Sequence, residues 1–326
     1  MSPFQYRRPG SLAEATSLLR LPGAYPLGGG TDLLPLQRDA LASPALVVDV
    51  RRLPGAAQVQ WLADGGVRIG AAARLAHLSR NAALRSAVPL LAESCAAVGG
   101  EALRHMGTLG GNLCQRVRCW YFRSGLSCHK NGGDRCRAAV GENQYHAIFG
   151  SGPCVAVHPS DPAVALTALE AVVHVAGGEG EREVAIADFY ARAHLPGDRE
   201  TVLAPGEMVT AVTIPAASCG GVQHFEKVTQ RAAFDFALVS VAALRRTDGE
   251  VRLVLGGVAS HPWRVTDSIE EDVGSGGLSD DDVETLAQRA LYDAAPLAHN
   301  GYKVDIAAAV LQRAMRVLLQ GDGAPA

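Results

Sequence analysis

The sequence predicts a mixed α+β protein of two domains, and three observations support this prediction. The chain has 326 residues, more than one ordinary compact core contains. Hydrophobic residues make up 48% of it and charged residues 19%, which is typical of a folded rather than a disordered protein. Strand and helix patterns alternate along the first half, whereas the C-terminal part has strands followed by helices.

The first half begins with a predicted helix. Ser11 and Glu14 have the spacing of a capping box, and apolar residues follow them. A short apolar run then leads through Pro26 into a glycine loop, which indicates a strand that ends at a tight turn. Apolar periodicity further predicts strands over residues 45–50, 59–61 and 67–71, and one or two amphipathic helices over residues 75–98.

The regular pattern fails after Met106. About 50 residues rich in Gly, Cys, Arg and His follow, as far as Pro159. Segments of this length without secondary structure are uncommon in compact domains, so the stretch needs an organiser such as a bound cofactor. We therefore expect a cysteine-rich loop over about residues 114–158 within the first domain.

Regular patterning returns in an apolar run over residues 163–175 and in a strand over residues 207–214. The small, turn-prone stretch 216–221 is the predicted domain boundary, which gives domains over residues 1–217 and 218–326.

In the second domain we expect a strand over residues 223–229, a helix or turn, and a hairpin at Asp248-Gly249 that leads into a strand over residues 251–255. Two helices should follow. Ser279 or an adjacent Asp caps the first. The apolar face of the second consists of Ile306, Val310, Met315 and Leu318.

Charge and hydropathy exclude several classes of partner. The net charge of -3 offers no basic surface for nucleic acid. The N-terminus lacks the apolar stretch of a signal peptide, and no segment has the roughly 20 apolar residues that span a bilayer. The sequence thus predicts no nucleic-acid partner, no membrane insertion and a cytoplasmic location, although export together with a partner would place the chain in the periplasm.

Five of the seven cysteines lie in the irregular stretch, and the last four of these have the spacing C-x8-C-x7-C-x17-C. These four are Cys119, Cys128, Cys136 and Cys154. In a chain without a signal peptide, such a set indicates metal binding before disulfides. Zinc sites favour close pairs, whereas iron–sulfur clusters accept varied spacings, so the pattern favours iron and sulfur. The alternative, free structural cysteines, fits poorly with the charged residues around them.

Two glycine turns are candidates for binding a phosphate. Consecutive glycines at 28–30 let backbone N–H groups converge on an anion, although Leu33 stands where a Rossmann fingerprint has its third glycine. A simple tight turn is the alternative. The second turn, residues 108–112, adds a hydroxyl and an amide, and the two turns together form either a pyrophosphate clamp or two unrelated surface turns. Asp161 either accepts a hydrogen bond from a ligand hydroxyl or caps the helix that follows it.

Residues 28–33, 108–112 and 159–161 together resemble, in order and approximate spacing, the three FAD-contacting elements of the medium subunit of the xanthine dehydrogenase family of molybdenum hydroxylases. The resemblance extends over nearly the whole chain and includes Asn300-Gly301-Tyr302-Lys303 at the start of the last helix. It implies a vanillyl-alcohol-oxidase-type FAD-binding domain of two α/β lobes, followed by a small α+β domain.

The same resemblance implies roles for single residues. Those around the pyrophosphate would be Gly28, Gly29, Gly30, Thr31, Asp32 and Leu33, continued by Thr108, Gly110, Gly111 and Asn112. Asp161 would hold the ribityl or adenosine part. Lys227 would lie near the flavin ring, with a solvated strand lysine as the alternative. No residue is expected to act as an acid, base or nucleophile, because the redox centres carry the chemistry.

The cysteine-rich loop resembles the subgroup of this family that carries an extra cluster. This subgroup includes the flavin subunits of certain bacterial aldehyde dehydrogenases and of 4-hydroxybenzoyl-CoA reductase, and residues 145–149 are more similar to the aldehyde-oxidising type. The resemblance implies a [4Fe-4S] cluster on Cys119, Cys128, Cys136 and Cys154.

The implied complex is a heterotrimer. A large partner would bind the molybdenum cofactor, a small partner would carry two [2Fe-2S] clusters, and this chain would pass electrons through FAD to an outside acceptor. The alternatives are the same role in a xanthine dehydrogenase or a 4-hydroxybenzoyl-CoA reductase, a stand-alone flavin oxidase, and a zinc-stabilised, non-catalytic assembly subunit.

Overall fold

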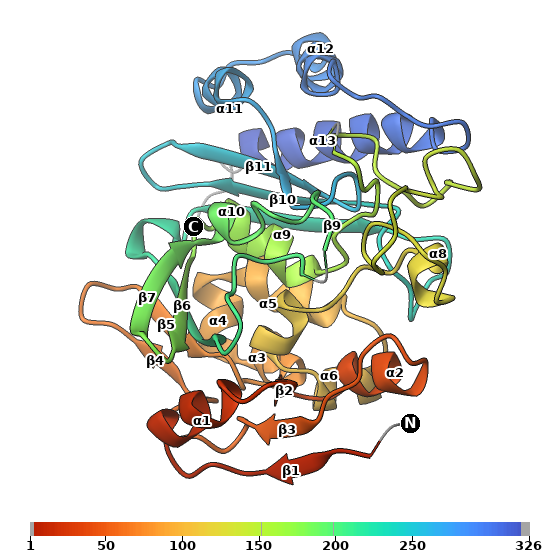
Figure 1. Ribbon diagram of the computed structural model, residues 1–326. Helices are drawn as coiled ribbons and strands as arrows, with labels where there is room; N and C mark the ends of the chain where they lie inside the picture. Colours follow the sequence, from red (N-terminus) through yellow and green to blue (C-terminus); the bar gives the residue numbers. More distant parts are fainter. Residues whose placement is uncertain (1–2, 151, 198, 321–326) are drawn as a thin grey trace.

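Three β-sheets organise the chain (Figure 1), whose computed structural model describes residues 3–150, 152–197 and 199–320. The first sheet is parallel and has the order β1 (Gln5–Arg7), β3 (Leu46–Asp49), β2 (Ala24–Leu27). Its buried strand β3 packs against α1 (Leu12–Leu19), and α2 (Leu33–Arg38) follows the glycine loop after β2. Only half of the predicted capping box forms: Ser11 accepts from the Glu14 N–H, but the Glu14 carboxylate accepts from the N–H of Gly10.

The second sheet is antiparallel and has five strands. Their order is β4 (Val59–Trp61), β5 (Val67–Gly70), β8 (Met208–Ile214), β6 (Val172–Gly177), β7 (Gly180–Ala185). The one or two helices predicted over residues 75–98 are in fact three short ones, α3 (Leu75–Arg80), α4 (Ala82–Ala87) and α5 (Pro89–Ala96), because the Asn81 side chain caps α4 and Pro89 starts α5. Two more short helices, α6 (Glu101–Met106) and α7 (Leu109–Leu113), lead to the cysteine-rich loop.

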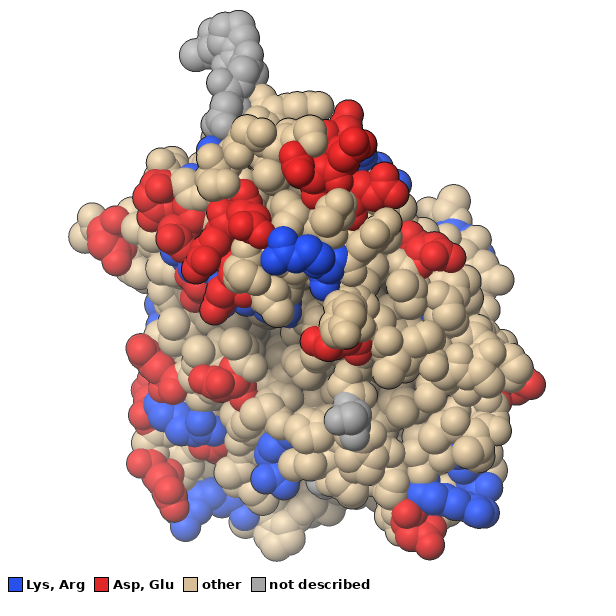
Figure 2. Space-filling view, turned by 90° about the horizontal axis from the view of Figure 1, so that it is seen from above, with Lys and Arg blue, Asp and Glu red and all other residues tan. Residues whose placement is uncertain are grey.

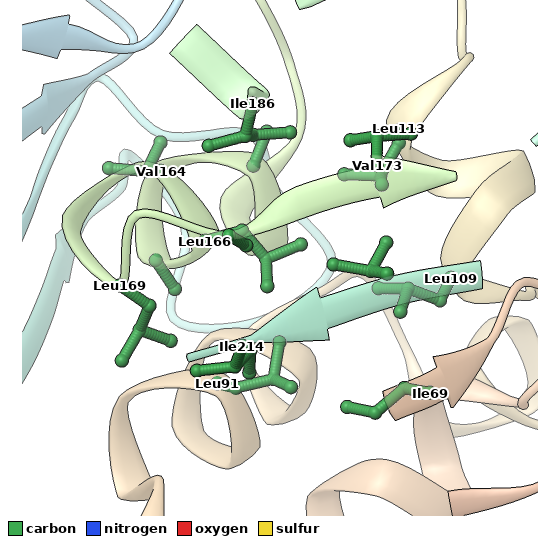
Figure 3. Close-up of a cluster of buried hydrophobic side chains, with 14 of the residues drawn as sticks. Ile69, Leu91, Leu109, Leu113, Val164, Leu166, Leu169, Val173, Ile186 and Ile214 are labelled. Carbon is green, nitrogen blue, oxygen red and sulfur yellow. The ribbon is translucent and has the colours of Figure 1, made fainter. Parts of the chain in front are cut away.

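A central helix, α9 (Asp161–Ala168), joins the second sheet to the third. All of its residues are buried, which explains why its sequence shows apolar residues on every side. Leu166 and Leu169 point toward Ile214 and Val173 of the second sheet (Figure 3). The expected apolar run over residues 163–175 is thus a buried helix followed by a turn and β6, while α10 (Ile186–Phe189) follows β7.

The third sheet is antiparallel, in the order β12 (Trp263–Arg264), β11 (Val251–Gly256), β10 (Val239–Arg245), β9 (Val222–Val228). The predicted hairpin at residues 248–249 joins β10 to β11. The helix or turn expected before this hairpin is wrong. These residues form strand β10, in which Val239 to Leu244 are all buried between two layers. The sheet is covered by α9 on one face and α13 (Tyr302–Gln320) on the other (Figure 1).

The outermost layer has one helix that the sequence pattern missed, α11 (Asp267–Gly274), and one that it predicted, α12 (Asp280–Ala290). Ser279 caps α12 in a complete capping box with Asp282. Acidic side chains gather on this face of the molecule (Figure 2). Like-charge repulsion therefore disfavours a polyanion there. Among the described residues, no helix is both long and apolar enough to cross a membrane.

The cysteine-rich loop stays almost free of regular structure, as predicted, with only α8 (Trp120–Arg123) inside it. In Figure 1 it runs along one side of the molecule, from the level of α2 to that of α13. It therefore touches parts of the chain that are far apart in sequence.

Candidate functional site

A cavity of about 1060 Å³ lies between the first sheet, the glycine turns and the third sheet. The structure brings nearly all of the predicted FAD-contacting residues to it. Its lining includes Gly28, Gly29, Gly30, Thr31, Asp32, Leu33, Thr108, Gly111, Asn112, Asp161 and Lys227. Gly110 instead lines a neighbouring cavity of about 470 Å³, and its α-carbon faces Ala71.

The two glycine turns pack backbone to backbone. A Cβ on Gly28 would come within 2.5 Å of the Thr108 hydroxyl oxygen, and one on Gly29 would overlap the carbonyl oxygen of Met106. Gly30 has φ +75°, a left-handed conformation that favours glycine. The Thr108 hydroxyl in turn accepts from the N–H of Gly111, 3.2 Å away. The glycines are therefore required for close approach of the chain to itself as well as for an open cavity wall.

The Asp32 carboxylate points toward the cysteine-rich loop. It accepts from the backbone N–H of Arg116 at 2.8 Å and pairs with the guanidinium groups of Arg118 and Arg123, each at 2.9 Å. Burial lowers the pKa of Arg118 to about 10, and its guanidinium lies over the ring of Phe236. Asp32 therefore joins the glycine loop to the loop that carries the cysteines.

Asp161 and Lys227 form a buried ion pair at the cavity, with 2.7 Å between Nζ and Oδ2. Lys227 also donates to the carbonyl of Ala97. Its side chain is only 8% exposed, so the alternative of a solvated strand lysine is wrong. Ser160, whose hydroxyl accepts from the N–H of Ala163, caps α9, so Asp161 is not the cap. Burial raises the pKa of Asp161 to about 6, and the nearby ammonium opposes that shift.

Aromatic residues that sequence reasoning missed close one side of the cavity. Phe234 and Phe236 line it and are 58% and 46% exposed. Phe234 has φ +57°, an uncommon conformation for a bulky residue. Nothing in the local pattern around residues 229–237 signals this position, because it depends on contacts with the distant Gly100 and Arg118.

The four cysteines that were predicted to bind metal line one small void beside the large cavity: Cys119, Cys128, Cys136 and Cys154. All four are free thiols. Among the described residues, no three His, Cys, Asp or Glu side chains converge tightly enough to hold a single metal ion. The four thiols thus form no site for a single ion, whereas an iron–sulfur cluster binds its thiolates through separate iron atoms.

The surroundings of the thiols are partly cationic. Burial raises the pKa of the Cys154 thiol to about 11, and the nearby Lys130 ammonium opposes this shift. Lys130 is itself buried and donates to the carbonyl of Leu195. His146 places Nε2 3.2 Å from the sulfur of Cys119, and burial lowers the pKa of this imidazole to about 4. Thiols must lose their protons to bind iron. A lysine ammonium and a neutral histidine lie beside these four thiols.

A single extended segment separates the cavity from the void. Gln115, Arg116 and Arg118 line the large cavity, whereas Val117 and Cys119 line the void. Adjacent α-carbons are about 3.8 Å apart, so Cys119 lies one peptide bond from a residue of the cavity wall. The two candidate sites are therefore direct neighbours.

Comparisons with known proteins agree with this geometry. Residues 2–217 match the family model described as the FAD binding domain in molybdopterin dehydrogenase, and residues 224–318 match that of the CO dehydrogenase flavoprotein C-terminal domain. The aldehyde oxidoreductase FAD-binding subunit PaoB of Escherichia coli is 39% identical over 94% of this chain and 95% of its own length. The glyceraldehyde dehydrogenase medium chain of Sulfolobus acidocaldarius is 30% identical over 88% and 86%.

Solved structures show the same fold. A chain of quinoline 2-oxidoreductase from Pseudomonas putida 86 superposes with a TM-score of 0.75, at 23% identity and 98% coverage of both chains. A chain of the carbon monoxide dehydrogenase of Hydrogenophaga pseudoflava gives the same TM-score at 22% identity.

The back-to-back packing of the glycine turns makes Gly29→Val a test of the large cavity. The valine side chain would collide with the Met106 backbone, which cannot move aside as a flexible side chain can, so the loop must shift and the purified variant should contain no flavin. Gly10→Ala is the control, because a Cβ there meets only the Glu14 carboxylate at 3.9 Å. Flavin absorbance per chain decides the test, and a full flavin complement in Gly29→Val would contradict the predicted role of the loop.

The buried ion pair predicts a pH-dependent loss of stability in Lys227→Met. Without its cation the Asp161 carboxyl is buried alone, which costs about 3–5 kcal/mol when a buried pair loses one partner. Its folded-state pKa, already raised to about 6, rises further, so the variant's stability should be largest at acid pH and be lost as the pH rises from the unfolded-state pKa of about 4 up through the folded-state pKa. Urea unfolding of variant and wild type at pH 5 and pH 8 measures this difference.

Arg316→Met is the matched control for that experiment. It removes an exposed pair with Asp280 and should cost less than about 1 kcal/mol at both pH values. An equal loss for Lys227→Met at pH 5 and pH 8 would show that the carboxylate charge of Asp161 is not what Lys227 stabilises.

Proposed function

Because the chain belongs to the FAD-binding medium subunits of the molybdenum hydroxylases, we propose that it transfers electrons in an aldehyde-oxidising heterotrimer. A large partner subunit with the molybdenum cofactor would oxidise the substrate, and a small partner with two [2Fe-2S] clusters would deliver the electrons to this chain. The likeness to the E. coli aldehyde oxidoreductase subunit over nearly its full length supports the aldehyde as substrate class.

We assign FAD to the large cavity, where it supplies a carrier that exchanges electrons with clusters and with an outside acceptor. The glycine turns at residues 28–33 and 108–112 would hold the pyrophosphate, because both line the cavity and consecutive glycines leave backbone N–H groups free to point at an anion. Asp161 would bind hydroxyl groups of the ribityl or adenosine part, and Lys227, fixed by its ion pair, would lie near the flavin ring. Asp32 would act indirectly, because arginines already occupy its carboxylate.

We also assign a [4Fe-4S] cluster to Cys119, Cys128, Cys136 and Cys154. The observation that carries this assignment is that cysteines from separated parts of an irregular loop line one void next to the FAD cavity. Unrelated structural cysteines would have no reason to meet, because each would be buried wherever local packing placed it. The one-residue wall between the two sites would keep the path for electrons short.

The visible spectrum of the anaerobically purified chain, with iron and acid-labile sulfide measured on the same sample, tests both assignments. We expect flavin bands over a broad shoulder from thiolate-to-iron charge transfer, with about four irons per flavin. Flavin without iron would leave the family role intact and overturn the cluster. Zinc without flavin would support an assembly subunit instead.

Cys128→Ala tests the ligand set. It removes one of the four thiolates, so bound iron and sulfide should fall sharply while the flavin remains, because Cys128 does not line the FAD cavity. Cys219→Ala is the control, since Cys219 lies far along the chain in the turn after β8 and lines neither site. Unchanged iron in Cys128→Ala, or equal loss in both variants, would refute the assignment.

A further inference from the structure

The ring of His146 lies against one of the four cysteines. Its Nε2 is 3.2 Å from the Cys119 sulfur, and the residue is 3% exposed. The other ring nitrogen, Nδ1, is buried and has no hydrogen-bond partner among the described residues. A proton on Nδ1 would leave a buried donor unsatisfied, whereas a proton on Nε2 reaches the sulfur. When Cys119 is a thiolate ligand its sulfur can only accept, so this contact requires the tautomer in which Nε2–H donates to Cys119.

The ring cannot easily turn away from the sulfur. Trp120 and Tyr121 flank it, with centroids 5.9 and 6.4 Å from that of His146. The His146 carbonyl accepts from Lys303 Nζ at 3.0 Å and from Asn300 Nδ2 at 3.1 Å, both at the start of α13. The histidine is thus fixed from its backbone by the C-terminal helix and from its ring by aromatic neighbours.

We propose that His146 is a positioning residue of the cluster, which raises the reduction potential of the cluster by donating a hydrogen bond to the Cys119 sulfur. The inference rests on the proposed cluster. Reduction adds negative charge to a cluster and its sulfurs, and an N–H aimed at a sulfur stabilises that charge. Because Asn300 and Lys303 hold the donor, the C-terminal domain would help to set the potential of a centre whose four cysteine ligands all belong to the first domain.

A redox titration monitored by electron paramagnetic resonance tests this proposal on the full chain. His146→Phe keeps a planar ring but has no donor, so the cluster potential should shift to a lower value at unchanged iron and flavin content. The flavin potential, measured on the same sample, should not shift, which separates a local hydrogen bond from general unfolding. His146→Gln retains an N–H donor and should restore much of the wild-type potential.

His129→Phe is the matched control. His129 lines the same void, but within the described part of the chain its ring makes no hydrogen bond to a cysteine sulfur like that of His146. This variant places an apolar ring beside the void without removing a hydrogen bond, so the cluster potential should stay at the wild-type value. An equal shift in His129→Phe and His146→Phe would overturn the proposal in favour of a general effect of apolarity.

The remaining outcomes are also decisive. An iron-loaded His146→Phe with the wild-type potential would overturn the hydrogen bond while leaving the cluster assignment intact. If His146→Phe loses iron, a His146→Gln variant that keeps iron near the wild-type potential supports the proposal, and loss of iron from both variants overturns it. A wild-type protein without iron would instead overturn the proposed cluster, and with it this inference.

Discussion

The carboxylate of Asp32 connects the two parts of the molecule that carry its chemistry. It belongs to the glycine loop, yet its three partners, Arg116, Arg118 and Arg123, belong to the cysteine-rich loop. Its side chain is 14% exposed, so these charge-assisted hydrogen bonds act at low local dielectric and hold their geometry firmly. The backbone that lines one cavity and the backbone that carries Cys119 are therefore fixed relative to each other. A displacement of either one strains the same set of bonds, which couples the large cavity to the void that the cysteines line.

Buried lysines make further contacts between segments that are far apart in the sequence. The chain has only three lysines, Lys130, Lys227 and Lys303, and all of them are withdrawn from solvent. Lys130 ties the cysteine-rich loop to the carbonyl of Leu195, Lys227 ties the third sheet to α9, and Lys303 ties α13 to the loop. A buried ammonium is costly unless several acceptors surround it, so each lysine specifies one arrangement of the segments it joins. The exposed cations are arginines, and water can solvate an exposed charge without a protein partner.

Much of the fold was predictable from sequence because local patterns determine it. Period-two and period-3.6 patterns located most strands and helices, whereas for the two glycine turns the local pattern left both a pyrophosphate clamp and two unrelated surface turns open. The failures have a common cause. Fully buried elements such as α9 and β10 show continuous apolar runs, which periodicity cannot assign to helix or strand. The aromatic wall at Phe234 and Phe236, and the contact of His146 with Cys119, depend on residues far apart in the chain. No local rule reports such contacts.

The cysteine-rich loop shows how a long segment is ordered without helices or strands. Its length alone argued for a cofactor as organiser, but protein contacts hold its two ends: Asp32 binds the segment around Arg116, and Asn300 and Lys303 bind the carbonyl of His146. Along this segment and just beyond it, the chain turns around a small void that the four cysteines line together with apolar side chains such as Val117 and Phe122. The anchors hold the loop to the glycine loop and to the start of α13, and a metal centre on the thiols would add its own binding free energy to these contacts. The two ends of the loop are thus held by contacts with the rest of the fold, whereas its middle would be held by a centre bound to the thiolates.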